Sequence, residues 1–261
     1  MHPIASGSDE YTVDEEARAA IRQIGTNAIP FLLAWVHYEE TPLRQRMRRL
    51  AQELPFSDRL YDMLVARSER ASQAEFAFMA LRTSASNAVP ALLQMLTNST
   101  EPDTADSASY ALGAIGEPAV PALVNILSDD RSPSLALAVR AFALMDALGT
   151  NGLPAVPGLL RGLNATDAKL RVYAIRALGR FALEPRIVVP ALMRTLTNSD
   201  SEVQGEVALA LADFREQAKP AIPALLQLQL KAPQDLRGAI DIALARIDPA
   251  SFSTNSALAQ P

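Results

Sequence analysis

Few residues in this chain are of the types that carry out enzyme chemistry. Cysteine is absent and histidine occurs only at His2 and His37, which excludes thiolate ligands and leaves too few imidazoles for a histidine-rich metal site. Most serine and threonine residues fall in polar turns, where hydrogen bonds to helix ends account for them, as for the adjacent Asp129 and Asp130. No GxSxG, P-loop or GxGxxG motif is present. We therefore expect no catalytic residue, no cofactor and no bound metal.

Arginine is the remaining residue type with binding chemistry, and it is concentrated in two segments. Residues 161–194 carry seven basic and two acidic side chains, a net charge of +5, whereas residues 71–139 carry two basic and seven acidic ones, a net charge of −5. The segment LRQRMRRLAQEL adds a run of four arginines, Arg44, Arg46, Arg48 and Arg49. Each arginine-rich segment is either a solvated, salt-bridged surface or a site for an anion or an acidic peptide.

One aromatic cluster stands out in a chain with only 5% aromatic residues. It consists of Phe31, Trp35, His37 and Tyr38. Two interpretations stay open. The cluster packs in the core at one end of the fold, or it forms a patch that binds a partner, because tryptophan and tyrosine are favoured at the energetic centres of interfaces.

These residues must be positioned by repeated elements, because one apolar pattern recurs six times. It begins AIPFLLAWV at Ala28 and returns as AVPALLQML, AVPALVNIL, AVPGLLRGL, VVPALMRTL and AIPALLQLQ. The pattern is anchored by six prolines, Pro30, Pro90, Pro121, Pro157, Pro190 and Pro223. The last four gaps between them are 31, 36, 33 and 33 residues, and the first is 60, about two units, with Pro55 marking a degenerate unit. Proline suits the first turn of a helix, so each anchor predicts the start of one helix, helix A.

A second pattern follows each anchor and predicts a second helix, helix B. Alanine precedes leucine or isoleucine in AIRQIG, ALRTSA, ALGAIG, ALGTNG, ALGRFA, ALADFR and ALARID, whose alanines are Ala20, Ala80, Ala111, Ala147, Ala177, Ala210 and Ala243. Polar turns rich in Asn, Ser, Thr and Asp supply N-caps, and Gly116, Gly149 and Gly152 suit helix ends. Residues 14–25 form a helix B without its helix A. One helix pair cannot bury its apolar faces alone, so the pairs must stack.

The AVPAL and ALGxIG stretches resemble HEAT-repeat proteins, especially the bacterial type, over residues 14–249. The resemblance implies an all-α solenoid of about seven helix pairs in a right-handed curved stack, with helices B lining its concave face. Such proteins usually hold peptides or proteins and sometimes nucleic acid. Hydroxylases built on HEAT-like repeats carry His-Glu pairs before the Ala-Leu-Gly, where this chain has SASYALG, LMDALG and YAIRALG. HEAT-like DNA glycosylases have a strongly basic concave face, which a net charge of −5 argues against.

Composition bounds the organisation of the chain. Hydrophobic residues make up 49% of its 261 residues, enough for a continuous core, and no run of 18 apolar residues predicts a membrane span. We expect a disordered leader or cloning remnant over residues 1–10, one solenoid over 11–249 and a disordered tail over 250–261. The start MHPIASGSDE lacks the features of a signal peptide, and a cytoplasmic location is expected.

The helical phase of the B helices predicts a binding groove. Residues off the core stripe in the central units include apolar and basic side chains, namely Tyr110, Phe142, Met145, Arg171, Tyr173, Arg176 and Arg180. Asp167, Arg171 and Arg237 are also candidates for an Asp-to-Arg ladder between neighbouring B helices. We expect a non-catalytic scaffold whose concave face holds a protein or peptide with acidic residues. The alternatives are a nucleic-acid binder acting through the arginine-rich repeats, or a regulatory subunit or enzyme of the HEAT-like lyase or hydroxylase type.

Overall fold

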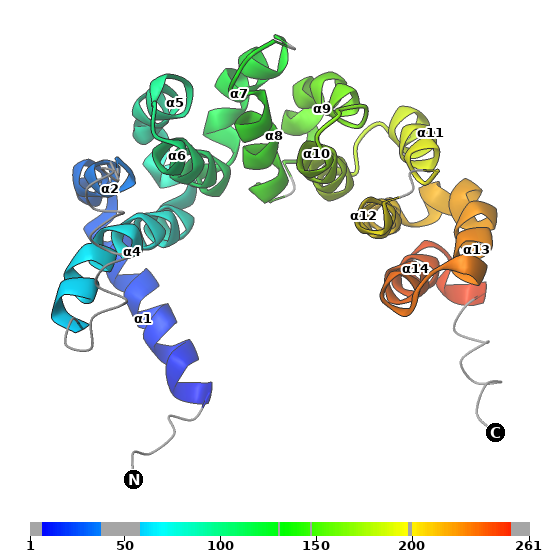
Figure 1. Cartoon of the computed structure of the whole chain (residues 1–261), viewed down its shortest axis with the longest axis horizontal. Coiled ribbons are helices and arrows are strands. Elements are labelled where there is room, and N and C mark those ends of the chain that lie inside the picture. Colours follow the sequence, from blue (N-terminus) through cyan, green and yellow to red (C-terminus); the bar gives the residue numbers. More distant parts are fainter. Residues whose placement is uncertain (1–6, 38–57, 130, 147, 198–199, 252–261) are drawn as a thin grey trace. The chain divides into compact units, whose positions relative to one another are not determined.

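The computed structural model describes residues 7–37, 58–129, 131–146, 148–197 and 200–251, and every regular element in these ranges is a helix. This confirms the all-α prediction. The chain divides into two compact units, Met1–Ala119 and Val120–Pro261, hereafter unit 1 and unit 2. Each unit is built from helices A, which follow the anchor prolines, and helices B (Figure 1).

Unit 1 begins with a B helix that has no A helix before it in the described chain. Its elements are α1 (Gly7–Ile24), the 3-10 helix η1 (Gly25–Ala28), α2 (Ile29–Val36), α4 (Asp58–Leu81), η2 (Arg82–Ala88), α5 (Val89–Asn98), α6 (Pro102–Ile115) and η3 (Glu117–Ala119). The B helices are α1, α4 and α6, and the A helices are α2 and α5. Both α1 and α2 pack against α4, and α6 packs against α4 and α5.

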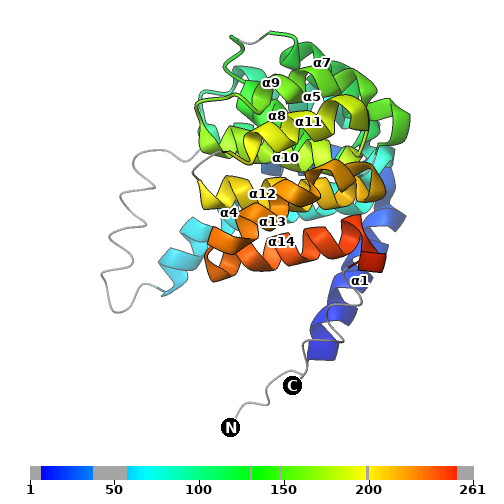
Figure 2. The same cartoon turned by 90° about the vertical axis from the view of Figure 1, so that its right-hand side faces the viewer.

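Unit 2 consists of four A–B pairs in two layers. Its elements are α7 (Val120–Leu127), α8 (Leu135–Leu144), η4 (Gly149–Ala155), α9 (Val156–Gly162), α10 (Ala168–Phe181), α11 (Pro185–Thr195), α12 (Ser201–Asp213), η5 (Arg215–Ala221), α13 (Ile222–Lys231) and α14 (Gln234–Ile247). The B helices α8, α10, α12 and α14 pack side by side, each against the next, and the A helices form the other layer (Figures 1 and 2).

The anchor prolines begin helices as predicted, with one exception. Pro30, Pro90, Pro121, Pro157 and Pro223 lie in the first turn of α2, α5, α7, α9 and α13, and a 3-10 turn precedes each of these helices. Pro190 instead lies inside α11, which starts five residues earlier at Pro185. Pro185 occupies the first turn of α11, so the prediction that Pro190 begins this helix is wrong.

A residue with a left-handed backbone lies at or shortly after the end of six of the seven described B helices, and these residues recur with the repeat. The φ angle is positive at Gly25, Arg82, Gly116, Gly149, Ala182 and Arg215, and the last five are separated by 34, 33, 33 and 33 residues. Glycine adopts this conformation without strain, whereas arginine and alanine do not. The glycine stop is confirmed at Gly116, the C-cap of α6. Helix α8 ends earlier, at Leu144, and Gly149 begins η4, so the assignment of Gly149 as a helix end is wrong. Gly152 lies inside η4, so its assignment as a helix end is wrong.

This periodicity corrects the alignment of two B helices. Four residues before each left-handed residue lies a central apolar side chain, hereafter the central B position: Ile21, Phe78, Leu112, Met145, Leu178 and Leu211, continued by Leu244. From Phe78 to Leu244 these side chains are at most 1% exposed. Sequence analysis placed Leu81 and Leu148 there instead. Three residues are almost one helical turn, so the shifted alignment presents a similar apolar face.

Polar turns cap the B helices in two repeats, as predicted. The Asp167 side chain accepts a hydrogen bond from the Lys169 backbone N–H at 2.9 Å, and Asp200 accepts one from Glu202 at 3.0 Å. These residues satisfy backbone donors that have no partner within the first turn. The caps fix where α10 and α12 begin and therefore which of their faces meets the neighbouring helices.

The predicted boundaries of the leader, the repeats and the tail agree only in part with the observed helices. Helix α1 begins at Gly7, inside the segment expected to be a leader, and residues 252–261 of the expected tail lie outside the described ranges. Pro55 also lies outside them, so the degenerate unit that it was predicted to mark stays a prediction, and the chain after it forms one continuous helix, α4. A single array over residues 11–249 stays a prediction, since each unit is compact by itself. Within the described chain no single helix is long and apolar enough to cross a membrane, although α6 and residues 117–127 together reach that length as a bent pair.

Candidate functional site

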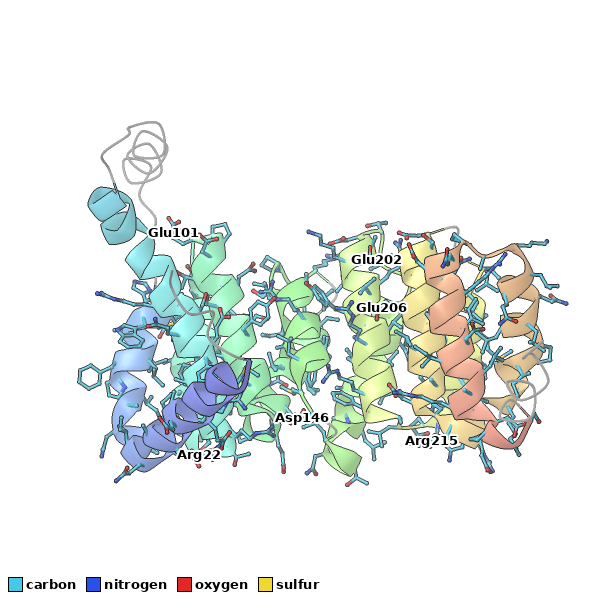
Figure 3. All side chains as sticks on the ribbon, turned by 90° about the horizontal axis from the view of Figure 1, so that it is seen from below. Arg22, Glu101, Asp146, Glu202, Glu206 and Arg215 are labelled. Atoms are coloured by element: carbon cyan, nitrogen blue, oxygen red, sulfur yellow. The ribbon has the colours of Figure 1, made fainter. Side chains whose placement is uncertain are left out.

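Three B helices of unit 2, α10, α12 and α14, expose a regular stripe of side chains. Positions nine, five and two residues before the central B position, and two residues after it, face outward. On α10 these are Lys169, Tyr173, Arg176 and Arg180, and on α12 they are Glu202, Glu206, Leu209 and Asp213. The two glutamates lie on successive turns of α12 (Figure 3). The stripe is therefore basic on one helix and acidic on the next.

These opposite charges pair with each other across the helices. Arg176 Nε donates to Glu206 Oε2 at 2.9 Å, and its Nη2 donates to the other carboxylate oxygen, Oε1. This two-pronged hydrogen bond raises the pKa of Arg176 above its ordinary value, against the opposing effect of burial. Arg246 Nη1 of α14 likewise lies 3.6 Å from Asp213 Oδ1. The basic excess of residues 161–194 is thus offset by the neighbouring repeat, which lowers its attraction for an acidic partner.

Arg171 serves the turn before its own helix. Its Nη1 donates to the carbonyl oxygens of Ala165 at 2.7 Å and Thr166 at 3.0 Å. The same position in the next two repeats is Gln204, which donates to Leu196 O at 3.1 Å, and Arg237, which donates to Ala232 O at 2.8 Å. All three side chains satisfy carbonyls of the A-to-B turn. The predicted partner-binding role of Arg171 and the predicted Asp-to-Arg ladder are therefore wrong for this residue.

Two other predicted site residues belong to the core. Phe142 and Met145 are both fully buried, so neither is accessible to a partner. Met145 occupies the central B position of its repeat, and Phe142 packs edge-to-face on Phe181 with ring centroids 6.1 Å apart. Both were assigned to the groove because the alignment of α8 was shifted by three residues. Correct alignment would have shown Met145 at the position of Leu112 and Leu178.

The remaining predicted residues divide between the units. Tyr173, Arg176 and Arg180 share the exposed stripe of α10, where Tyr173 is half-buried and the two arginines are exposed. Tyr110 lies in unit 1 on α6 and is 38% exposed. The structure therefore brings three of the seven predicted residues together on one surface.

Unit 1 contains an open apolar groove of about 870 Å³. We call it the α1 groove. It is lined by twelve residues of α1, η1, α2 and α4: Ala17, Ile21, Ile24, Asn27, Ala28, Phe31, Leu32, Trp35, Ser72, Gln73, Phe76 and Ala77. None of them is charged, and only three have polar side chains. A groove of this size and character suits apolar side chains of a ligand.

The groove opens where α1 lacks the packing that most later B helices have. Ile24, the last residue of α1, is 53% exposed, whereas Ile115, Phe181, Phe214 and Ile247 at the same repeat position are at most 5% exposed. Ala17 is likewise exposed, while Ala74, Ala108, Ala141 and Ala174 at its position are completely buried. The sequence pattern of a core stripe is therefore present in α1, but no helix of the described ranges covers it.

Two aromatic residues of α2 complete the opposite wall. Phe31 is 69% exposed and Trp35 is 37% exposed. The residue after the anchor proline is Phe31 in this repeat, but Ala91, Ala122, Gly158, Ala191 and Ala224 in the others. For these two members of the aromatic cluster the structure supports the surface interpretation. Tyr38 and the arginines between 44 and 49 lie outside the described residues.

The signal for this groove was present in the sequence in two parts. Residues 14–25 were recognised as a helix B without a helix A, and Phe31 is the one large side chain at a position that is otherwise alanine or glycine. Combining the two would have predicted an open face bordered by aromatics. The sequence left the aromatic cluster open as a binding patch, but the groove was predicted from charge and helical phase on the central B helices.

Neither a second cavity nor a metal site is a stronger candidate for function than the α1 groove. A cavity of about 510 Å³ between α9 and α11 is lined by Arg161 and Arg194 among others, but Arg161 donates to the carbonyl oxygens of Leu127 and Pro157, so that guanidinium is already engaged. Within the described ranges no group of three or more His, Asp or Glu side chains is arranged to hold a metal ion.

Family models match two parts of the chain. One described as HEAT repeats matches residues 156–245, and one described as PBS lyase HEAT-like repeat matches residues 105–129. These matches confirm the prediction of HEAT repeats, and they do not test the predicted bacterial type. No match was found among curated protein sequences.

Solved structures with the same fold are repeat solenoids. A designed armadillo repeat protein in complex with the peptide (KR)4 is 18% identical, with a TM-score of 0.50 over 77% of this chain and 99% of that one. An engineered protein is 25% identical, with a TM-score of 0.51, and the match covers 77% of this chain and 57% of that one. HEAT and armadillo solenoids are typically non-catalytic, and the likeness to the armadillo protein shows the fold alone.

Proposed function

We propose that this HEAT-repeat protein is a non-catalytic binding module that holds a partner protein or peptide in the α1 groove. The observation that carries the proposal is the open core stripe of α1. Ala17, Ile21 and Ile24 have the residue types of a buried stripe, yet they face an accessible groove. A contiguous exposed apolar surface on a folded protein marks an interaction site.

The composition of the groove favours a protein partner over a polar small molecule. Trp35 and Phe31 are rigid side chains of the kind that anchor interfaces. The absence of charge among the lining residues favours apolar side chains of the partner, rather than the acidic residues expected from sequence. On unit 2, an acidic peptide would compete with Glu206 for Arg176. Tyr173, Arg176 and Arg180 stay a predicted second contact surface.

A peptide-display selection tests the proposal. A random 16-residue library is selected on the folded 261-residue chain, and each clone is then measured on Ile24→Lys and on Met79→Lys. Both positions lie in the last turn of a B helix of unit 1, both are more than half exposed, and a cation is favourable there. Only Ile24 lines the groove, so Met79→Lys is the matched control.

Clones that bind through the groove should lose at least about 30-fold in affinity on Ile24→Lys, because a buried ammonium group is strongly penalised. They should change by less than about twofold on Met79→Lys. A selection that yields no binders, or only binders equally affected by both variants, would contradict the proposal. Circular dichroism and thermal unfolding of both variants confirm that the fold is retained.

A further inference from the structure

We infer that the occupant of the α1 groove is an α-helix, lying where the A helix of α1 would lie in a complete repeat. This inference rests on the proposed function. It adds the secondary structure of the partner segment and the sizes of the side chains that it presents.

Unit 2 shows which side chains of a repeat face its own A helix. In that unit α9 is the A helix of α10. A Cβ built on Gly162 of α9 would lie 2.8 Å from the Cβ of Ala174, and one built on Gly152 of η4 would lie 3.3 Å from the Phe181 ring. Ala174 and Phe181 lie four residues before and three residues after the central B position. In α1 those positions are Ala17 and Ile24, so both face the place of an A helix.

The A helices also show which side chain faces the preceding A helix. A Cβ built on Gly158, the residue after the anchor proline of α9, would lie 2.7 Å from Leu127 Cβ of α7. Its counterpart in α2 is Phe31. Ala17, Ile24 and Phe31 therefore border one position from two sides, and in the stacked repeats that position is filled by a helix.

The A helices of the described repeats contain 7 to 11 residues, so a partner helix of about two to three turns would fill this position. Because the lining carries no charge, an amphipathic helix with apolar residues at i, i+3 or i+4 and i+7 fits it.

Phe31 limits the size of the side chain that the partner helix can place against it. In unit 2 a small residue, Gly158, receives a large one, Leu127. In unit 1 the arrangement is reversed, since Phe31 projects from α2 and is 69% exposed. The helix residue that faces Phe31 should therefore be small, alanine or glycine, while the residues that face Ala17 should be large and aliphatic.

The experiment starts from the groove-dependent clones of the display selection. Each peptide is made in three forms: linear, stapled as a helix on its polar face, and with one central residue replaced by proline. Stapling should tighten binding about tenfold or more, because a preformed helix avoids the cost of ordering. Proline should weaken it by about 100-fold or more, since it breaks a helix interior. Groove-dependent peptides that tolerate proline and weaken on stapling would overturn the helix while leaving the proposed function intact.

A second selection, on Phe31→Ala, tests this limit on side-chain size. Alanine is the residue found here in four other repeats, so this variant should fold normally. Its selected peptides should carry leucine, methionine or phenylalanine where the wild-type peptides carry alanine or glycine. Exchanging the two sets of peptides should cost each about tenfold or more in affinity. Identical preferences on both proteins would overturn the placement of the helix against Phe31. Absence of any groove-dependent peptide would overturn the proposed function itself.

Discussion

Helices α1 and α10 carry the same apolar stripe and differ in what covers it. In α10, Ala174, Leu178 and Phe181 are at most 5% exposed because an A helix and two B helices surround them. In α1, Ala17 is exposed, Ile21 is half-buried and Ile24 is 53% exposed. In a solenoid, the fate of an apolar residue is decided by its neighbours in the stack, so the same local pattern produces core in one unit and a binding surface in the other.

The largest expected effect on stability distinguishes two truncations at equivalent repeat positions. Leu178→Ala should lower the free energy of unfolding by about 2–5 kcal/mol, the usual loss for a fully buried leucine. Ile21→Ala, at the same repeat position, should lose only about 1 kcal/mol, because its side chain is already partly hydrated. Urea denaturation followed by circular dichroism measures both. Equal losses would mean that the α1 stripe is covered in solution.

Close helix contacts in unit 2 provide the next test. A Cβ on Gly179 would lie 2.8 Å from both the Cα and the Cβ of Ala210, so α10 and α12 approach at backbone distance. Gly179→Ala should therefore destabilise the protein by about 1–3 kcal/mol. Gly238 of α14 has no atom within 4 Å of its built Cβ, so Gly238→Ala is the matched control and should stabilise by about 0.5–1 kcal/mol. A tolerated alanine at both positions would show that the repeats are more loosely stacked than the structure indicates.

The left-handed glycines that follow B helices should behave alike in both units. Gly25 in unit 1 and Gly149 in unit 2 have φ angles of 60° and 53°, and a Cβ on either would meet no atom within 4 Å. Alanine at either position should cost about 1 kcal/mol from backbone strain alone. Conversely, Arg215→Gly should stabilise by about 0.5–1 kcal/mol, since arginine already occupies this conformation at a φ of 50°. Thermal unfolding of the three variants checks the signs. A cost at Gly149 only would mean that α1 ends differently from the other B helices.

The sequence predicted where the helices lie better than which of their faces are buried and which are exposed. The prolines and the polar caps act within one turn of the chain, so Pro157 and Asp167 were placed correctly. The alignment of α8 failed because Ala147–Leu148 imitates the Ala-Leu pair three residues after Met145, and only the left-handed residue at Gly149, spaced regularly between Gly116 and Ala182, reveals the shift. The groove could not be derived from any single repeat, because it arises from a neighbour that is absent beside α1 in the described chain.

The smallest expected effects concern charge. Arg176→Ala removes the hydrogen bonds to Glu206, and Arg18→Ala removes a guanidinium that lies 5.0 Å from the Phe76 ring centroid at the edge of the α1 groove. Each should lower the free energy of unfolding by only about 0.5 kcal/mol or less, because Arg176 is exposed and Arg18 remains partly in contact with water. The raised pKa of Arg176 means that its stabilising contribution is present below its ordinary pKa and is lost only as pH rises through the higher folded-state value. Between pH 7 and 10 the loss on Arg176→Ala should therefore be constant, and it should shrink in high salt. Losses that match Leu178→Ala would show that charge, rather than apolar coverage, separates the packed repeats from the open one.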